Sequence, residues 1–140
     1  MAEMDWHRVD LFAPTPEHVL LADSLRQFVT REVEPQAADH DRSESFNHAL
    51  FRRAGDLGLL GITLPEEFGG TDLEATAAVQ VFEELSTADP GFALAVLAHA
   101  ILFAQNVNVN GDERQRKRVL PRAASGHGQT RKRRYQPTRL

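Results

Sequence analysis

The sequence contains no cysteine, and only one tryptophan and one tyrosine among its 140 residues. Without cysteine the chain has no disulfide, no thiol nucleophile and no cysteine-ligated metal. Residues 1–10 also lack the basic start and apolar block of a signal peptide. The longest nearly apolar run, Phe92–Ala104, is interrupted by His99 and is shorter than the roughly 18 residues of a membrane span. We therefore predict a cytoplasmic protein without a membrane span, in which this run forms a buried core helix.

Recognisable catalytic signatures are also absent from the sequence. There is no nucleophilic serine motif, phosphate-binding loop, HExxH pair or glycine-rich dinucleotide signature. Two adjacent carboxylate pairs, Glu66–Glu67 and Glu83–Glu84, point their side chains apart, which favours surface positions over catalysis. His40 and His48 match no established metal-ligand spacing. The sequence predicts no catalytic residue and no metal site.

Acidic and basic residues are unevenly distributed along the chain, whose net charge is −4. Residues 1–110 hold 18 acidic and 6 basic side chains, whereas residues 111–140 hold 2 acidic and 10 basic ones. The segment 127–140 has no acid and little apolar content, which predicts a disordered basic tail. The cations at 131–134 would attract phosphate, but Tyr135 is the one aromatic beside them. We therefore predict no specific nucleic-acid partner.

Helical periodicity dominates the sequence, and no segment alternates with the period of a β-strand. Thr15 is followed by proline, a combination typical of a helix start. Apolar residues then recur at helical spacing, which predicts a helix over about 16–40 with a bend or local break at Pro35. After Ser45, a one-sided apolar stripe predicts a second helix that ends near Leu57.

Three further helices follow in the pattern. Asp72 is a candidate N-cap for a third helix, which ends just before Asp89. Asp89 and the proline after it start a fourth helix, which is apolar on nearly every face and therefore central. The segment 106–111 is expected to break this helix. Asp112, with a glutamine three residues later, forms a capping-box variant that opens a short basic helix to about Leu120.

These elements predict an all-α fold, a bundle of about five helices with an irregular apolar loop at 58–70. The length suits one domain, which we place at residues 1–126, followed by the tail 127–140. His99 is the one polar side chain within the apolar run of the fourth helix. Because a buried polar atom needs a partner, we expect it to bond a backbone carbonyl or another side chain.

The loop after the second helix carries the most distinctive motif, LGLLGITLPEEFGGT at Leu57–Thr71. Gly58 allows the helix to end with apolar residues folding back on it. Pro65 favours extended backbone before it, and the glycines at 69–70 add conformational freedom. Through this motif and the order of the helices, residues 11–126 resemble the amino-terminal helical domain of the FAD-dependent acyl-CoA dehydrogenases, in which the segment has the form LGLLGI-x-x-PEE-[FY]-GG. The sequence is similar to isovaleryl- and short-chain-type members in particular.

The resemblance implies an origin in a flavoprotein oxidoreductase that acts on acyl-CoA thioesters. In that family FAD and substrate lie between a helical domain, a β-domain and a C-terminal helical bundle, which provides a glutamate base. Directly after Gly126 the family has a strand that leads to a motif of the type [ST]-E-P-x-x-G-[ST]-D, where this sequence has HGQTRKRRYQPTRL. We therefore interpret the chain as truncated before the flavin-binding β-domain, inactive alone and without tight FAD binding. No residue of the chain is assigned to FAD.

By the same resemblance, one face of the fourth helix bounds the pocket for the acyl chain of the acyl-CoA substrate. Ala93, Leu97 and Ile101 lie on that face at intervals of four residues, with Leu94 beside them. They would act by shape and apolar contact, and an ordinary place in the core is an equally open interpretation. Without covering domains, Ala93, Leu97 and Ile101 are expected to form an exposed apolar patch that promotes self-association.

Three interpretations of the chain stay open on the sequence alone. It is a truncated or frameshifted gene product, one piece of a multi-chain enzyme, or a non-enzymatic helical module that binds a partner. Flavin absorbance of the purified protein distinguishes the last two, because the partner-binding interpretation predicts none.

Overall fold

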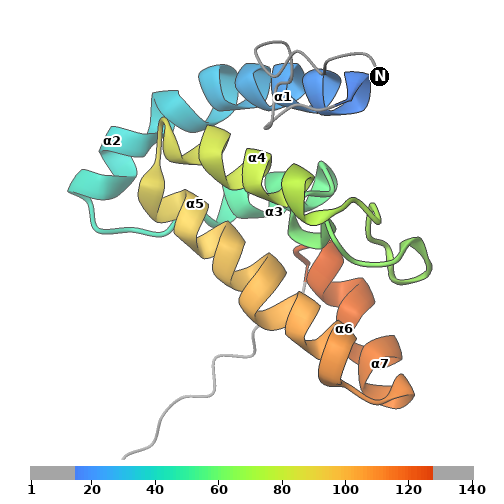
Figure 1. Cartoon of the computed structure of the whole chain (residues 1–140). Helices are drawn as coiled ribbons and strands as arrows, with labels where there is room; N and C mark the ends of the chain where they lie inside the picture. Colours follow the sequence, from blue (N-terminus) through green and yellow to red (C-terminus); the bar gives the residue numbers. More distant parts are fainter. Residues whose placement is uncertain (1–14, 128–140) are drawn as a thin grey trace, which may run out of the picture.

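The computed structural model describes residues 15–127, and every regular element in that range is helical (Figure 1). Five continuous helical stretches form an all-α bundle, which confirms the fold class predicted from the sequence. The predictions for residues 1–14 and for 128–140, most of the basic tail, lie outside the described residues.

The first stretch is one continuous helix in which the backbone hydrogen-bond pattern changes locally. It consists of α1 (Pro16–Phe28), a π-helical segment η2 (Val29–Val33) and α2 (Glu34–Arg42). The Thr15 side chain accepts a hydrogen bond from the backbone N–H of His18, so the predicted cap is confirmed. At η2, the N–H of Glu34 donates to the carbonyl of Val29, five residues earlier. The break in the α-helical ladder predicted at Pro35 is thus confirmed, because the widened turn directly precedes this proline.

The second helix, α3 (His48–Asp56), begins later than predicted. The side chain of Asn47, rather than that of Ser45, caps it by accepting a hydrogen bond from the Leu50 N–H at 2.9 Å. The Ser45 hydroxyl lies 3.0 Å from the imidazole of His40 instead. The predicted start after Ser45 is wrong because this residue closes the turn that follows α2.

The loop after α3 folds inward and joins the core, as an irregular apolar loop should. It contains two single turns of 3-10 helix, η3 (Leu59–Gly61) and η4 (Glu66–Phe68). Gly58 has a φ of 79°, a left-handed conformation that favours glycine. The side chains that the loop buries are those of Leu59, Leu60, Ile62, Leu64 and Phe68.

Backbone hydrogen bonds join the two halves of this loop and delay the next helix. The N–H of Asp72 donates to the carbonyl of Leu64, and the next N–H donates to that of Ile62, both at 2.9 Å. Asp72 has a φ of 52° and is held in the loop. The predicted cap at Asp72 is therefore wrong, and α4 (Ala75–Ser86) begins after Glu74 without a side-chain cap.

The fourth stretch, which we call the long helix, extends further than predicted. It consists of α5 (Pro90–Leu97), a π-helical segment η5 (Ala98–Gln105) and α6 (Asn106–Asn110). Asp89 caps its start, as predicted, by accepting a hydrogen bond from the Phe92 N–H at 2.8 Å. The predicted break at 106–111 is wrong for residues 106–110. The side chain of Asn110 bonds that of Asn106 at 2.7 Å within the helix, and the chain leaves helical geometry at Gly111.

The long helix satisfies the length and composition criteria for a membrane-crossing helix, with a mean hydropathy of 1.6. Within residues 15–127 it is the one helix that does so. Core helices of soluble proteins satisfy the same criteria, and 28% of the apolar window of this helix is buried inside the bundle. In the bundle the helix packs against α4 near its start and against α7 near its end (Figure 1).

The last helix, α7 (Glu113–Ala124), opens with the predicted capping box. The Asp112 carboxylate accepts from the Gln115 N–H, and the Gln115 side chain accepts from the Asp112 N–H, both at 2.8 Å. The helix passes its predicted end and continues through Pro121. Three buried side chains hold this final part against the core, those of Leu120, Ala123 and Ala124.

Two apolar clusters make up the core. The larger is formed by α1, η2, α3, η3, α4 and α5, and its fully buried members include Val33, Leu60, Val81, Leu85 and Val96. The smaller lies beneath α7 and contains Leu64, Phe68, Ala104, Leu120, Ala123 and Ala124. Because the long helix contributes to both clusters, its orientation is fixed along most of its length.

Candidate functional site

The long helix carries all four residues that the sequence assigns to an acyl-chain pocket. The structure exposes them to different extents. Ala93 is buried with 3% of its surface exposed, whereas Leu94 is 64% exposed. Leu97 and Ile101 are half-buried, and Ile101 packs against the larger core cluster. The assignment of these four residues to an acyl pocket stays a prediction, but they do not share one accessible surface.

The exposed apolar surface of this helix is formed by other residues than those expected. Its large members are Leu94, Leu102, Phe103 and Val109. The expectation of an exposed patch along Ala93, Leu97 and Ile101 is wrong in position. The helix is apolar all round, so its sequence did not indicate which side the other helices would cover.

A groove that the sequence did not predict lies beside this surface, between α3, the long helix and α7. It has a volume of about 1290 Å³ and is lined on its apolar side by Phe46, Phe51 and Phe103. Its basic side chains are those of Arg52, Arg118 and Arg122. The spacing of residues within each helix indicates which of them share a face. It does not predict the groove, because α3 and α7 come together only in the tertiary structure.

His99 lies at the floor of this groove and joins the long helix to α7. Its Nε2 atom lies 2.9 Å from the carbonyl oxygen of Ala123, which confirms the expected backbone partner. The imidazole also meets the rings of Phe51 and Phe103 edge-on, with centroid distances of 5.2 and 5.5 Å. These contacts give His99 a structural role, because its Nε2 atom and its ring are both engaged.

The carboxylates are spread over the described surface rather than collected at one site. Glu84 bonds Arg26 at 3.1 Å, and Glu113 bonds Lys117 within α7. The hydrogen bond from Lys117 lowers the pKa of Glu113 and raises that of the lysine. Residues 15–127 contain no group of three or more histidines and carboxylates that could hold a metal ion. The chemistry that the described residues offer is therefore apolar contact and cationic hydrogen bonding.

Comparison with known proteins shows which family has this domain. Residues 15–127 match the family model described as "Acyl-CoA dehydrogenase, N-terminal domain". The chain is 34% identical over 114 residues to a probable acyl-CoA dehydrogenase of Bacillus subtilis, which covers 80% of this chain and 19% of that protein. It is also 34% identical over 108 residues to the mitochondrial isovaleryl-CoA dehydrogenase of Pongo abelii, covering 76% of this chain and 26% of the relative.

A solved structure gives the same result. The acyl-CoA dehydrogenase of Bacillus anthracis, crystallised in complex with FAD, superposes with a TM-score of 0.70 at 34% identity. The match covers 81% of this chain and 19% of that one. The chain therefore spans less than a third of the length of the relatives it matches.

Proposed function

Because the chain belongs to the acyl-CoA dehydrogenase family through the N-terminal domain of that family, we propose that it forms one wall of an acyl-binding site for the FAD-dependent oxidation of acyl-CoA thioesters. The observation that carries this proposal is the long helix, which presents large apolar side chains to the surface at Leu94 and Leu102. Such side chains select an acyl chain by shape and by removal of apolar surface from water. The cytoplasmic location stays a prediction.

FAD would supply the hydride chemistry of that reaction. The described residues do not fit a flavin on their own. The exposed face of the long helix is an apolar wall, and its histidine, His99, is already bonded to the carbonyl of Ala123. A flavin ring placed there would meet no aligned set of hydrogen-bond donors. We accordingly propose that this chain alone neither holds FAD tightly nor catalyses the dehydrogenation.

Titration of the purified full chain with FAD and with isovaleryl-CoA is expected to show negligible affinity for either. The physical reason is that one wall buries only part of each ligand's surface, which does not offset the entropy lost on binding. Isothermal calorimetry and flavin absorbance provide the measurement. A stoichiometric yellow complex with a micromolar dissociation constant, roughly 8 kcal/mol of binding free energy, would contradict the proposal of negligible FAD binding.

The acyl-wall proposal is tested in a chimera. Residues 15–127 replace the matching domain of the Bacillus subtilis dehydrogenase, and acyl-CoA substrates of increasing chain length are compared. Leu94→Trp is expected to raise the KM for the longer substrates by about tenfold, because the larger ring fills the space beside the helix. Val109→Trp is the control, since Val109 is similarly exposed at the far end of the long helix. Equal KM values for the two variants would reject a role of this wall in acyl-chain selection.

A further inference from the structure

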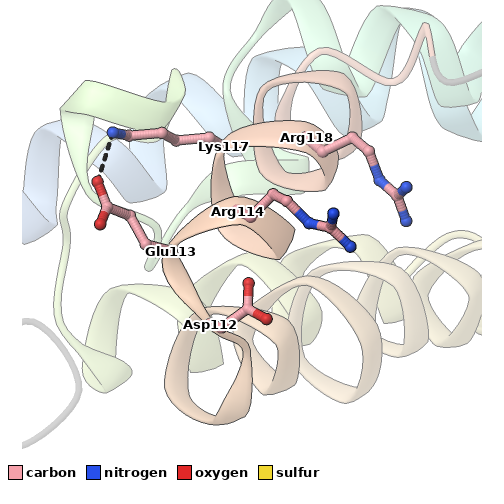
Figure 2. Close-up of a pocket in the computed structure, with 5 residues that line it drawn as sticks. All are labelled: Asp112, Glu113, Arg114, Lys117 and Arg118. Atoms are coloured by element: carbon pink, nitrogen blue, oxygen red, sulfur yellow. Dashed lines mark hydrogen bonds and ion pairs between the residues drawn. The ribbon is translucent and has the colours of Figure 1, made fainter.

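An arginine stripe runs along one side of α7. Arg114, Arg118 and Arg122 follow each other at intervals of four residues, and all three are exposed. Figure 2 shows Arg114 and Arg118 projecting from the same side of the helix, while Glu113 and Lys117 pair on the other side. None of the three arginines forms an ion pair with a residue in the described part of the chain. Like charges at this spacing repel one another, so an anion bound along the stripe would stabilise it.

The stripe leads into the groove between α3, the long helix and α7. Arg118 and Arg122 line this groove, and Arg52 lies in its wall on α3. No carboxylate lines it, although residues 15–127 hold 17 acidic and 10 basic side chains. The aromatic side chains of Phe46 and Phe103 lie beside these cations and are each 44% exposed. The groove therefore combines accessible apolar surface with a local concentration of positive charge on an otherwise acidic domain.

We propose that this groove and the arginine stripe bind an acidic amphipathic helix of a partner protein, a function beyond the proposed acyl wall. Arginines four residues apart on a helix are separated by about 6 Å along its axis. Glutamates at the same interval on a partner helix meet them in register, whereas a single small anion meets only one. Apolar residues on the adjoining face of the partner helix would pack against Phe46 and Phe103, the usual arrangement of a helix in a groove.

The ring geometry favours a helix over a nucleic acid. Single-stranded nucleic acids also carry regularly spaced anions, and they bind through bases stacked on open aromatic faces. In the groove, Phe51 meets His99 edge-on at 85°, and Phe46 is tilted against Phe51 at 59°. These rings pack against one another and do not form a row of parallel platforms.

The test measures binding of a fluorescein-labelled synthetic helix by fluorescence anisotropy at low salt. The probe has glutamates at every fourth position and leucines on the adjoining face. The full-length protein is expected to bind it and to lose affinity as salt is raised. Arg118→Glu is expected to weaken binding by about tenfold, and reversal of all three stripe arginines should abolish it. Arg31→Glu is the matched control, because Arg31 is exposed, unpaired by any described residue and remote from the groove.

Two further probes complete the experiment. A peptide with lysine in place of each glutamate should bind the variant in which all three stripe arginines are glutamate, which restores the pairing with opposite charges. Circular dichroism confirms that each variant is folded. Equal binding of a scrambled peptide of the same composition, equal losses for Arg31→Glu and Arg118→Glu, or tighter binding of oligo-deoxythymidine would each overturn the proposal.

Discussion

Replacement of Gly70 by alanine is expected to destabilise the protein by about 3 kcal/mol. A Cβ atom at this position would lie 2.0 Å from the carbonyl oxygen of Leu64 and 2.6 Å from its Cβ. Leu64 is fully buried, and its carbonyl accepts the hydrogen bond from Asp72 that holds the loop together. The backbone would have to move and would disturb this contact. The midpoint of urea unfolding, followed by circular dichroism, measures the effect.

Gly91→Ala provides the matched control. The nearest atom to a Cβ there would be the carboxylate oxygen of Asp89, at 3.5 Å. Alanine also favours helical geometry over glycine. This variant should therefore match or slightly exceed the wild type in stability. If Gly70→Ala unfolds at the same urea concentration as Gly91→Ala, the close approach between Gly70 and Leu64 does not support the loop as the structure indicates.

Adjacent residues of the long helix are expected to respond in opposite ways to a new charge. Ala93→Glu places a carboxylate in the larger core cluster and should destabilise the fold by about 4 kcal/mol. Leu94→Glu places the same group on a surface that is 64% exposed, and the loss should stay within about 0.5 kcal/mol. Urea unfolding of the two variants provides the comparison.

The same pair tests the predicted self-association. A charge at Leu94 interrupts the exposed apolar face and should lower the proportion of oligomer in sedimentation velocity. The stability of the Leu97→Glu variant is expected to lie between those of Ala93→Glu and Leu94→Glu, because Leu97 is half-buried. Comparable destabilisation by Ala93→Glu and Leu94→Glu would show that the helix is oriented differently in solution.

Helix starts were predictable wherever the cap is a local feature. Thr15, Asp89 and Asp112 each accept a hydrogen bond from a backbone N–H three residues later, and each contact is specified by neighbours in the sequence. Ser45 and Asp72 are equally suitable capping residues by type. Neither residue caps a helix in the structure. Ser45 closes a turn against His40, and Asp72 is held in a loop by its hydrogen bond to the carbonyl of Leu64.

By itself, the sequence determined the helical class, the irregular apolar loop at 58–70 and the family, because periodicity and a continuous motif are properties of neighbouring residues. Only the tertiary structure decided which face of the long helix is buried. Ala93 and Leu94 are both apolar, and the choice between them depends on the helices that pack alongside. The groove was decided in the same way, since Arg52, Phe103 and Arg118 come from three helices and become neighbours only when the chain folds.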